Sequence, residues 1–562
     1  MELLRATISP SILSKADRLF RNDDRGIFTE LLQNARRAGA NRVEVTIEPS
    51  PEHDQATRVT FEDNGHGIED FQKLLTLGDS NWNPEVLAIE DPAGMGFFSL
   101  CHSTVEGSSG EKKTVLTREV FLGQVPAEVV PSDAHVHGTR IVFTRPTVSK
   151  AVEVALKDAS EFNPLDVTLN GERLERHDFL EGALHREVID GIEIGISTLF
   201  RWKFGWDRVD WNFHGSVIRE PFGLIHGFLA RDDKGQWREE YLHVRFDVLE
   251  VGRVKLQLPD RRAIVQDSEL VAFKKKVRTA VYRFLSTQEH HVLSFEQWKE
   301  AQSLGVSIAE ASPYLTTWHA QPADPDAPPF FGQTETHLLP TLDDVLLVDA
   351  HLPSQHTLEA ALTPSAIPSK TFYQVQSRFS GYSWYDRLPI LTEAEVLVDG
   401  IPHEEREEDN KERPREILVK ATIKQQGHED LRLDLPAAIH VLDGMEVFDG
   451  YEPPSFLAVR DSSWDNDALS GPFDVAQYLV SATFSPGDDV ECDSYDTQRY
   501  EFERHVDRVV NEYFRGPRAA LMAALEDSLS WEARRYAEQA GVKEIRFRKQ
   551  EESDHGWVLE LA

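Results

Sequence analysis

Three short boxes follow one another between Gly26 and Ser99 and constrain this chain more than any other feature. They read Glu-Leu-Leu-Gln-Asn-Ala at 30–35, Asp-Asn-Gly-His-Gly-Ile at 63–68 and Gly-Met-Gly-Phe-Phe-Ser at 94–99. Each box coincides with the boundary or the face of an expected helix or strand. The three together therefore predict one composite site rather than three unrelated surface turns.

The first box lies in a helix expected over residues 26–37, which Gly39 ends. Glu30 and Asn34 are four residues apart, so their side chains share one helix face, one turn apart. Taken alone, this spacing also describes two surface polar residues on an amphipathic helix. The other two boxes are what favour a functional interpretation.

The second box follows a strand expected over residues 57–62, which delivers Asp63 at its end. A carboxylate there can accept a hydrogen bond from an exocyclic amino group, as adenine offers. Gly65 and Gly67 let the backbone approach a planar ligand closely. The alternative is an ordinary Asp-Asn-Gly turn, and His66 is interpreted as an incidental loop residue.

The third box follows a glycine- and proline-containing loop over residues 78–92 and opens a helix expected over residues 97–104. Gly94 and Gly96 permit close backbone approach, and a helix N-terminus presents unpaired N–H groups to anions. A fourth, shorter signal is Gly138-Thr139, which precedes a strand expected over residues 140–143.

In order, spacing and context these boxes resemble the nucleotide pocket of the GHKL ATPases, the superfamily of gyrase, the ninety-kilodalton heat-shock chaperones, histidine kinases and MutL-type proteins. The Phe-Phe-Ser ending of the third box is similar to the chaperone branch. The resemblance covers about 150 residues closely. It implies ATP and Mg²⁺ as cofactors and a Bergerat-type fold for the N-terminal domain.

The resemblance also implies residue roles. Asn34 would hold Mg²⁺ through its side-chain oxygen. Glu30 would be the general base that activates water, and Asp63, supported by the Thr139 hydroxyl, would select adenine. Further nucleotide contacts would come from Gly65, Gly67, Gly94, Gly96, Phe97 and Ser99.

Two features qualify the resemblance. Residues 78–91 would form a lid that closes over ATP and excludes water. Many relatives carry an acidic residue three positions after the magnesium asparagine, where this chain has Arg37. That cation either pairs with an acid elsewhere or faces solvent.

A second resemblance lies in residues 256–266, which read Leu-Gln-Leu-Pro-Asp-Arg-Arg-Ala-Ile-Val-Gln. They look like the catalytic loop of the chaperone middle domain, in which an arginine reaches the γ-phosphate. Arg262 matches that arginine and Gln266 a nearby polar partner, with Arg261 in reserve. The alternative is a strand-to-helix turn with solvated arginines. In DNA-acting relatives a lysine takes this role, and Lys255 keeps that option open.

The fold class is expected to be α+β, because 562 residues exceed one core and helix and strand patterns mix throughout. We expect a two-layer GHKL sandwich, an α/β middle (transducer-like) domain and a mixed C-terminal region of unknown role. Within these, residues 68–77 read as a helix and 113–122 as a strand. The predicted boundaries are 1–185, 186–320, a proline-rich linker at 321–330, and 331–562.

The composition bears on the kinds of partner and on the cellular location that we expect. The formal net charge of −36 argues against a large non-specific nucleic-acid surface, though a local basic patch stays open. Two cysteines cannot form a disulfide framework. No apolar run long enough to span a membrane occurs, and the N-terminus lacks signal-peptide character. These features predict a cytoplasmic protein without a membrane partner.

The preferred hypothesis is a chaperone-like ATPase in which lid closure and domain rearrangement, with dimerisation, act on a partner protein. Its support is the Phe-Phe-Ser extension, the Arg262 loop and the acidic composition. One alternative is a DNA-transacting ATPase similar to MutL or topoisomerase subunits. Another is a non-hydrolysing ATP sensor in signalling or phage defence.

Overall fold

The structure, a computed structural model, shows the predicted α+β class and divides into two compact units, Met1–Ala311 and Ser312–Ala562. Each unit is described by itself. The residues that the structure describes are 23–51, 56–76, 96–199, 208–221, 225–249, 254–257, 263–362, 367–406, 413–442, 455–459, 469, 471–487, 494–528, 531–549 and 557–561.

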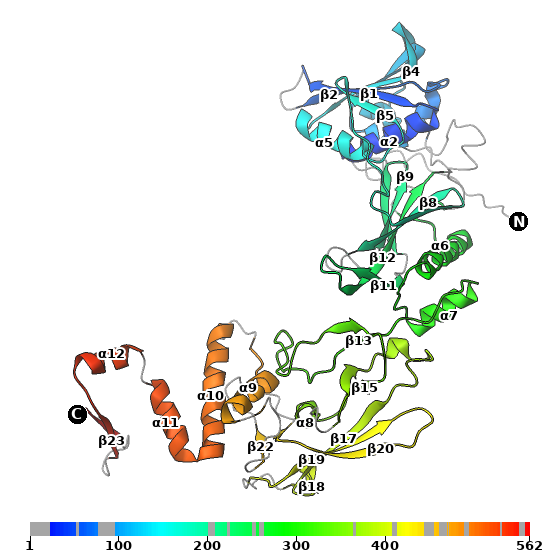
Figure 1. Cartoon of the computed structure of the whole chain (residues 1–562). Helices are drawn as coiled ribbons and strands as arrows, with labels where there is room; N and C mark the ends of the chain where they lie inside the picture. Colours follow the sequence, from blue (N-terminus) through cyan, green and yellow to red (C-terminus); the bar gives the residue numbers. More distant parts are fainter. Residues whose placement is uncertain are drawn as a thin grey trace, which may run out of the picture. The chain divides into compact units, whose positions relative to one another are not determined.

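The first sheet of unit 1 has six strands in the order β3-β4-β2-β1-β5-β6 (Figure 1). Its strand β1 is antiparallel to β2 and parallel to β5, and its exposed and buried residues alternate because one face of the sheet is covered. Asn170 and Gly171 form the predicted turn between β5 and β6, both at positive φ. The strands are β1 (Arg42–Pro49), β2 (Thr57–Asp63), β3 (Val105–Leu116), β4 (Val129–Arg145), β5 (Asp166–Leu169) and β6 (Glu172–Arg173).

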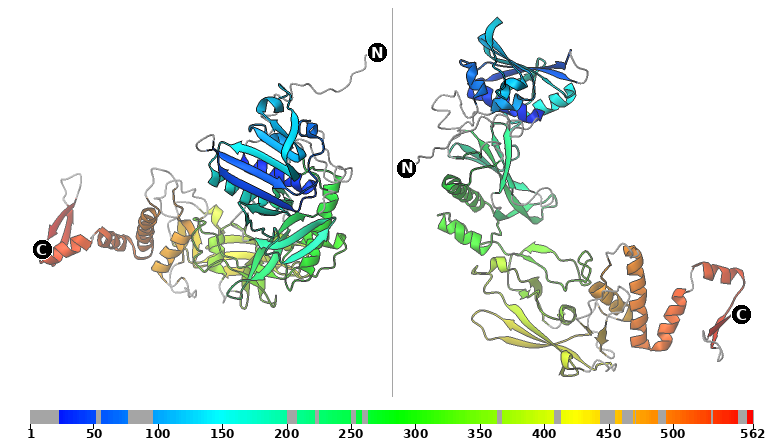
Figure 2. Two further views of the ribbon diagram at one scale, coloured as in Figure 1. Left: turned by 90° about the horizontal axis from the view of Figure 1, so that it is seen from above. Right: turned by 180° about the vertical axis from the view of Figure 1, so that it is seen from behind.

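Two helices, α2 (Asp24–Arg37) and α5 (Ser149–Ser160), pack against each other on one face of this sheet (Figures 1 and 2). The side chain of Asp23 caps α2 by accepting a hydrogen bond from the Gly26 N–H at 2.7 Å. Arg145, which is 3% exposed on β4, donates to the carboxylate of Asp24 at 2.5 Å. These contacts fix where α2 begins relative to the sheet.

Two sequence predictions in this domain are wrong in detail. Residues 68–77 were expected to be helical, but only the short 3₁₀ helix η2 (Phe71–Leu75) forms, because Asp70 caps it and the chain is already extended at Thr76. The expected strand over 113–122 instead ends at Leu116. There α4 (Arg118–Phe121) begins, and it buries Phe121 against the core.

The second sheet of unit 1 has the order β10-β9-β12-β8-β7, and β11 also pairs with β12. Helix α6 covers its core, where Trp211 and Phe246 are almost fully buried with Phe273 of α6. Its elements are β7 (His185–Ile189), β8 (Ile192–Leu199), β9 (Arg208–Phe213), β10 (Ser216–Pro221), β11 (Ile225–Arg231), β12 (Trp237–Val248), α6 (Ser268–Ser286) and α7 (Phe295–Ser303).

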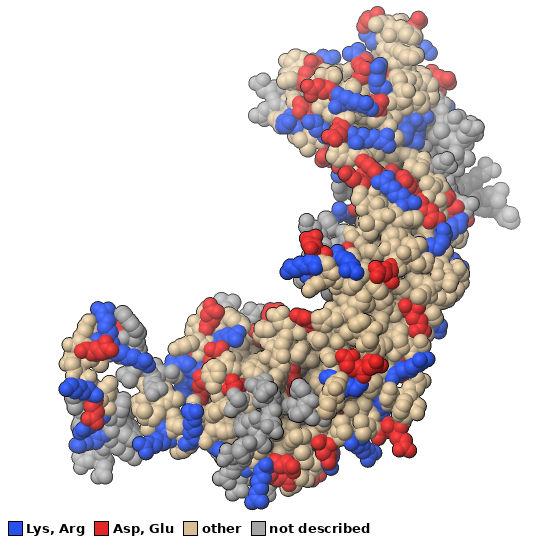
Figure 3. Space-filling view, viewed as in Figure 1, with Lys and Arg blue, Asp and Glu red and all other residues tan. Residues whose placement is uncertain are grey.

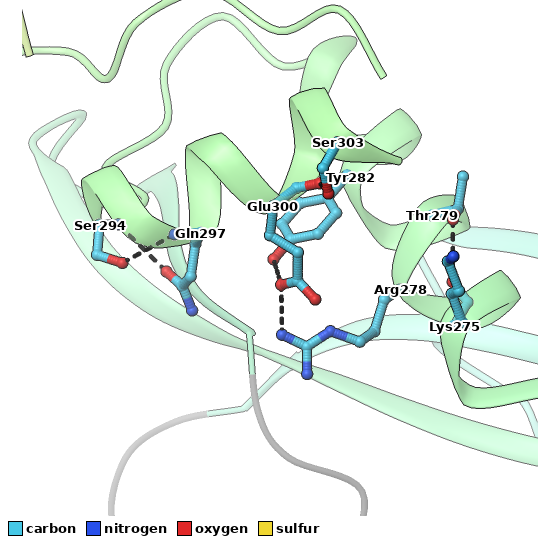
Figure 4. Close-up of polar contacts among 8 residues, drawn as sticks. All are labelled: Lys275, Arg278, Thr279, Tyr282, Ser294, Gln297, Glu300 and Ser303. Atoms are coloured by element: carbon cyan, nitrogen blue, oxygen red, sulfur yellow. Dashed lines mark hydrogen bonds and ion pairs between the residues drawn. The ribbon is translucent and has the colours of Figure 1, made fainter. Parts of the chain in front are cut away.

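A polar clamp joins α7 to α6 (Figure 4). The carboxylate of Glu300 on α7 accepts hydrogen bonds from the Arg278 guanidinium and the Tyr282 hydroxyl, both at 2.5 Å. Burial, followed by the bond to Glu300, raises the pKa of Tyr282. Ser294 and Gln297 form a capping box that starts α7. Arg278, one of the basic side chains of α6, is therefore engaged in a structural contact.

Unit 2 is built on a sheet in the order β16-β15-β17-β19-β20, with β18 beside β17. Helix α8 packs near β19 and β21. Its strands are β13 (Tyr314–Thr316), β14 (Thr336–Leu338), β15 (Val345–Val348), β16 (Thr371–Gln374), β17 (Ile390–Val398), β18 (Ile401–Pro402), β19 (Ile417–Lys424), β20 (Leu431–Pro436), β21 (Ile439–Val441), β22 (Phe456–Ala458), β23 (Ile545–Lys549) and β24 (Trp557–Leu561).

The helices of unit 2 gather towards its C-terminal half. A second core joins α9 and α10 to β21 and β22, and Phe330 and Phe331 pack against it. The segment 321–330, expected as a linker, therefore makes contacts within unit 2. The predicted break at Gly516 separates α10 from α11. The helices are α8 (Gln355–Ala361), α9 (Pro472–Thr483), α10 (Tyr495–Arg515), α11 (Pro517–Ser528) and α12 (Trp531–Gln539), with 3₁₀ turns η4 (Ser377–Phe379) and η5 (His403–Glu405).

His440 on β21 is a fully buried histidine, and it makes the stability of unit 2 depend on pH. Its Nδ1 shares a 2.7 Å hydrogen bond with the Thr357 hydroxyl, and burial together with the His403 ring lowers its pKa from 6.5 to about 4. A neutral buried imidazole must be protonated on unfolding in acid, so its stabilisation is complete above pH 6.5 and is lost towards about pH 4. The loss is about 3 kcal/mol.

We expect His440→Gln to reduce the drop in thermal unfolding temperature of the full chain between pH 7 and pH 4. Glutamine can still accept from Thr357 but does not titrate. Calorimetry at both pH values measures the difference, with His428→Gln on an exposed turn as the control. An equal acid-induced drop in both variants and the unmodified chain would contradict this origin.

The face shown in Figure 3 carries lysine and arginine as well as aspartate and glutamate, over both units. Basic side chains are therefore present on the surface of a chain whose net charge is strongly negative. Among the helices that the structure describes, none combines the length and the apolar character required to cross a bilayer.

Candidate functional site

Helix α2 presents Glu30 and Asn34 together, as the spacing predicted. Both side chains are half-buried, and the opposite face of α2 packs into the core of the first sheet domain. We use first and second sheet domain for the parts of unit 1 that are built on its first and second sheets. The helix is anchored at its start by Asp23 and at its end by Gly39, which adopts positive φ. The buried residues of α2 are Ile27, Phe28, Leu31, Leu32, Gln33 and Ala35.

Asp63 ends β2, a strand that lies between β1 and β4, and its residue is 8% exposed. Its carboxylate accepts a hydrogen bond from the Gly65 N–H at 2.9 Å. Thr139 is directly opposite Asp63 in the register of β4 and also hydrogen-bonds to it. Burial raises the pKa of Asp63, and the bonds from Gly65 and Thr139 oppose that rise. The structure thus brings together Asp63 of the second box and Thr139 of the Gly138-Thr139 signal.

The turn that follows Asp63 is tied to the end of α2. The His66 N–H donates to the carbonyl of Ala38 at 2.9 Å. The Asn64 side-chain oxygen accepts from the backbone N–H groups of Asn41 and Arg42, both at 3.0 Å. These hydrogen bonds hold the turn of the second box against the segment that directly follows the helix of the first box.

Glycine is required where β4 crosses this turn. Gly138 has φ +79°, and an added Cβ would overlap the carbonyl oxygen of Asp63. The neighbouring Gly67 has φ +82° and lies against the Ser109 hydroxyl.

Ser109 is a supporting residue that the sequence did not reveal. Its hydroxyl accepts from the Ile68 N–H at 2.8 Å and donates to the Gly138 carbonyl at 2.7 Å. It lies 41 positions from Ile68 in the chain, so no local pattern could have identified it.

The third box is described only from Gly96, so Gly94 lies outside the described residues. The expected helix over 97–104 is instead the 3₁₀ helix η3 (Gly96–Leu100), because Phe98 and Leu100 turn into the core at once. The described element is thus a short 3₁₀ turn rather than the longer helix that was expected, and the approach of Gly94 and Gly96 to an anion stays a prediction.

Gly96 lies against Glu30, where an added Cβ would overlap the glutamate Oε2. The first and third boxes are therefore in contact. The ring of Phe97 packs against Phe121, with centroids 6.0 Å apart, so this side chain contributes to the core. Ser99 is 6% exposed, and its hydroxyl oxygen has no hydrogen-bond partner in the described part of the chain.

Arg37 does not simply face solvent. Its guanidinium Nη1 donates to the side-chain oxygen of Asn34 at 3.4 Å. A positive charge thus lies beside the asparagine for which the sequence predicted a magnesium-binding role.

The predicted catalytic loop over residues 256–266 has its base in the second sheet domain. Leu256 and Ile264 make an isolated antiparallel bridge, and the Val265 N–H donates to the carbonyl of Lys255 at 2.8 Å. Gln266 is exposed, and its side-chain amide donates to the Ile264 carbonyl at 3.1 Å. The tip, residues 258–262, lies outside the described residues, and with it Arg261 and Arg262.

The site therefore joins a half-buried carboxylate, an amide oxygen and a buried carboxylate within one corner of the first sheet domain. Such a set can accept a hydrogen bond from a base, supply one hard oxygen to a cation and hold a general base. Among the described residues there is no cluster of three or more metal-ligating His, Cys, Asp or Glu side chains.

Residues 25–120 match the family model described as histidine kinase-, DNA gyrase B-, and HSP90-like ATPase. The matched segment contains all three boxes, so this part of the chain is similar to the ATPase domains of that family, and the match supports ATP binding. The match does not separate the HSP90 branch from the gyrase or histidine-kinase branches. No curated protein matches the chain.

Solved structures similar to this chain include the N-terminal domain of a DNA repair protein, at 14% identity over 48% of this chain and 96% of that chain, with a TM-score of 0.27. The gyrase B-subunit of Myxococcus xanthus matches at 10% identity, 47% and 89% coverage, and a TM-score of 0.28. The 43K ATPase domain of Thermus thermophilus gyrase B, in complex with an aminocoumarin, matches at 15% identity, 49% and 88% coverage, and 0.23. At TM-scores this low, the likenesses do not bear on the function of this chain.

Proposed function

We propose that this protein binds ATP between α2 and the end of β2, hydrolyses it with Mg²⁺, and uses the resulting rearrangement to act on a partner protein. The observation that carries the proposal is the set of hydrogen bonds that ties the turn after Asp63 to Ala38, Asn41 and Arg42, the segment that directly follows the helix bearing Glu30 and Asn34. This arrangement lies within the segment that matches the ATPase family model.

The base-recognising end of the site is Asp63. A buried carboxylate that already accepts from Gly65 and Thr139 has lone pairs left for one exocyclic amino group. The ionised form is required for this, and the bonds from Gly65 and Thr139 favour it against the effect of burial. Adenine is therefore the base that the site would select.

The phosphate end lies at Asn34. Its amide oxygen is the hard oxygen donor that Mg²⁺ prefers, and one protein ligand suffices where phosphates supply others. When bound, the cation would neutralise charge on the phosphate oxygens. Arg37 donates to this oxygen at 3.4 Å, which leaves the second lone pair of the oxygen for the cation. Its charge would remain beside the phosphates.

Glu30 is the proposed general base. It shares a helix face with Asn34, so it would lie near the terminal phosphate when Asn34 holds the cation. Gly96 leaves room for its carboxylate, because any Cβ there would overlap Oε2. A carboxylate in this place orients and deprotonates the attacking water.

The remaining parts of the proposal rest on the sequence. Residues 78–91 would close as a lid, Gly94 would approach the phosphates, and Arg262 would reach the γ-phosphate from the second sheet domain. All of these lie outside the described residues. The homodimer, the partner protein and a cytoplasmic location complete the chaperone-like proposal.

A partner should be captured only while ATP is held. We expect the full chain with Glu30→Ala, incubated with ATP and Mg²⁺, to retain a partner protein that the Asp63→Asn chain does not retain. The reason is that the first variant binds nucleotide without turning it over, whereas the second does not bind it. Affinity capture from extract, quantified by mass spectrometry, measures the difference. Equal capture by both variants would contradict an ATP-dependent action on a partner.

A further inference from the structure

Gln33 is a buried polar residue on α2 that has no role in the proposed ATP site. It immediately precedes Asn34 and is 6% exposed. Its side-chain Nε2 donates to the carbonyl of Phe213 at 2.7 Å and to that of His214 at 2.9 Å. Its Oε1 accepts from the Arg36 guanidinium at 3.3 Å. The amide is thus fully engaged, and both donor bonds cross to the second sheet domain.

The acceptors of these bonds lie at the tip of the β9–β10 hairpin, which reaches α2 (Figure 1). His214 and Gly215 form its two-residue turn, with φ +53° and +99°. Asn163, just after α5, donates to the same His214 carbonyl at 2.9 Å. A Cβ added to Gly215 would come within 3.0 Å of the Asn163 amide. The hairpin tip is therefore seated closely against both helices of the first sheet domain.

The other end of this hairpin contacts the base of the predicted catalytic loop over residues 256–266. Glu220 on β10 accepts a hydrogen bond from the Ile264 N–H at 2.7 Å. Glu220 lies five residues beyond Gly215, about 17 Å along an extended strand. One hairpin thus connects the helix of the ATP site to the segment that directly follows residues 258–262.

The hairpin is stiff enough to act as a connector. Trp211 on β9 is 1% exposed, and its ring stacks on Phe246 with centroids 3.9 Å apart. It also lies 5.6 Å from the ring of Phe273 on α6. Close-packed aromatic side chains transmit a displacement rather than absorb it. A shift of the tip should therefore move the hairpin and its sheet together.

We propose that the β9–β10 hairpin couples the position of α2 to the base of the 258–262 loop, and that Gln33 is the positioning residue that makes this coupling. The inference rests on the proposed ATPase function. Nucleotide bound at Asn34 would fix the position of α2. Through its hydrogen bonds, Gln33 would transmit that change in position to the second sheet domain. Loss of the contact should leave nucleotide binding intact and impair turnover.

The test uses the full chain with Gln33→Met, which keeps the length of the side chain and removes both donors. In the unmodified chain, ATP with Mg²⁺ should protect amides of residues 27–37 and also of residues 209–219 from hydrogen exchange. In the variant, only the protection over 27–37 should remain. A positioning role further predicts that kcat falls on the order of tenfold while KM changes by less than about twofold.

Two further variants complete the test. Gly215→Ala should give the same pattern from the opposite side, because its Cβ would press on Asn163 and it touches no residue of the site. Gln124→Met, on an exposed position, should behave as the unmodified chain. Protection over 209–219 that persists in both Gln33→Met and Gly215→Ala, or that is absent from the unmodified chain, overturns the coupling alone. Absence of protection over 27–37 in the unmodified chain overturns the ATPase function and the coupling with it.

Discussion

Replacing Asp63 with Asn is expected to abolish ATP binding by the full chain, with the dissociation constant rising about 100-fold or more. The carboxylate is buried at the end of β2 and is the charged acceptor for an exocyclic amino group. An asparagine that keeps the bond from the Gly65 N–H would turn its own NH₂ group towards the base. Two hydrogen-bond donors would then face each other. Isothermal titration with ATP measures the affinity.

The fold should survive this substitution, because it removes a buried charge whose pKa is raised by desolvation. Asp158→Asn, the same change on an exposed position of α5, is the matched control and should bind ATP normally. Unchanged affinity in Asp63→Asn would overturn the pocket assignment. Because burial raises the pKa of Asp63 above the ordinary 3.8, affinity in the unmodified chain should also weaken at a higher pH than an exposed aspartate would give.

Substitution of Glu30 by Gln is expected to reduce the rate of ATP hydrolysis by about 10²- to 10⁴-fold while ATP binding persists. Glutamine fills the same space beside Gly96 but cannot take a proton from water. Glu30→Ala should lose activity to the same extent. Phosphate release, measured with Mg²⁺ and again with the cation chelated, reports turnover and its dependence on magnesium.

Glu44→Ala, an exposed substitution on β1, serves as the control for loss of a carboxylate from this domain. If the unmodified chain binds ATP but releases no phosphate, the protein is a sensor rather than an ATPase. If Glu30→Gln hydrolyses ATP at the original rate, another residue is the base. These two results separate the function from the residue assigned to it.

Much of the site could be predicted because its signals are local. The four-residue spacing of Glu30 and Asn34 is a property of any α-helix, and the caps that delimit α2 are its immediate neighbours in sequence. Asp63 follows an alternating strand and is followed by a turn. Thr139 is a partial case: the resemblance suggested its role, and the antiparallel register of β2 and β4 is what places it opposite Asp63.

Two of the misassigned elements are helices that are shorter than expected. Residues 97–104 and 68–77 carry enough apolar side chains for a helix, yet only the short turns η3 and η2 form. Their apolar groups are taken by the core through contacts made elsewhere, such as Phe98 against Phe121. Local helix propensity is too weak to resist such packing.

The chain's own order of residues determined the elements and the boxes they carry, since hydrogen bonding and side-chain periodicity within a helix or strand involve close neighbours. Tertiary structure alone decided which distant groups meet. It placed Ser109 beneath the second box and the β9–β10 hairpin against Gln33, 180 residues away along the chain. Such contacts depend on strand register and domain packing. The three boxes between Gly26 and Ser99 therefore indicate that ATP binds. The contacts around Gln33 indicate how ATP binding would be coupled to the second sheet domain.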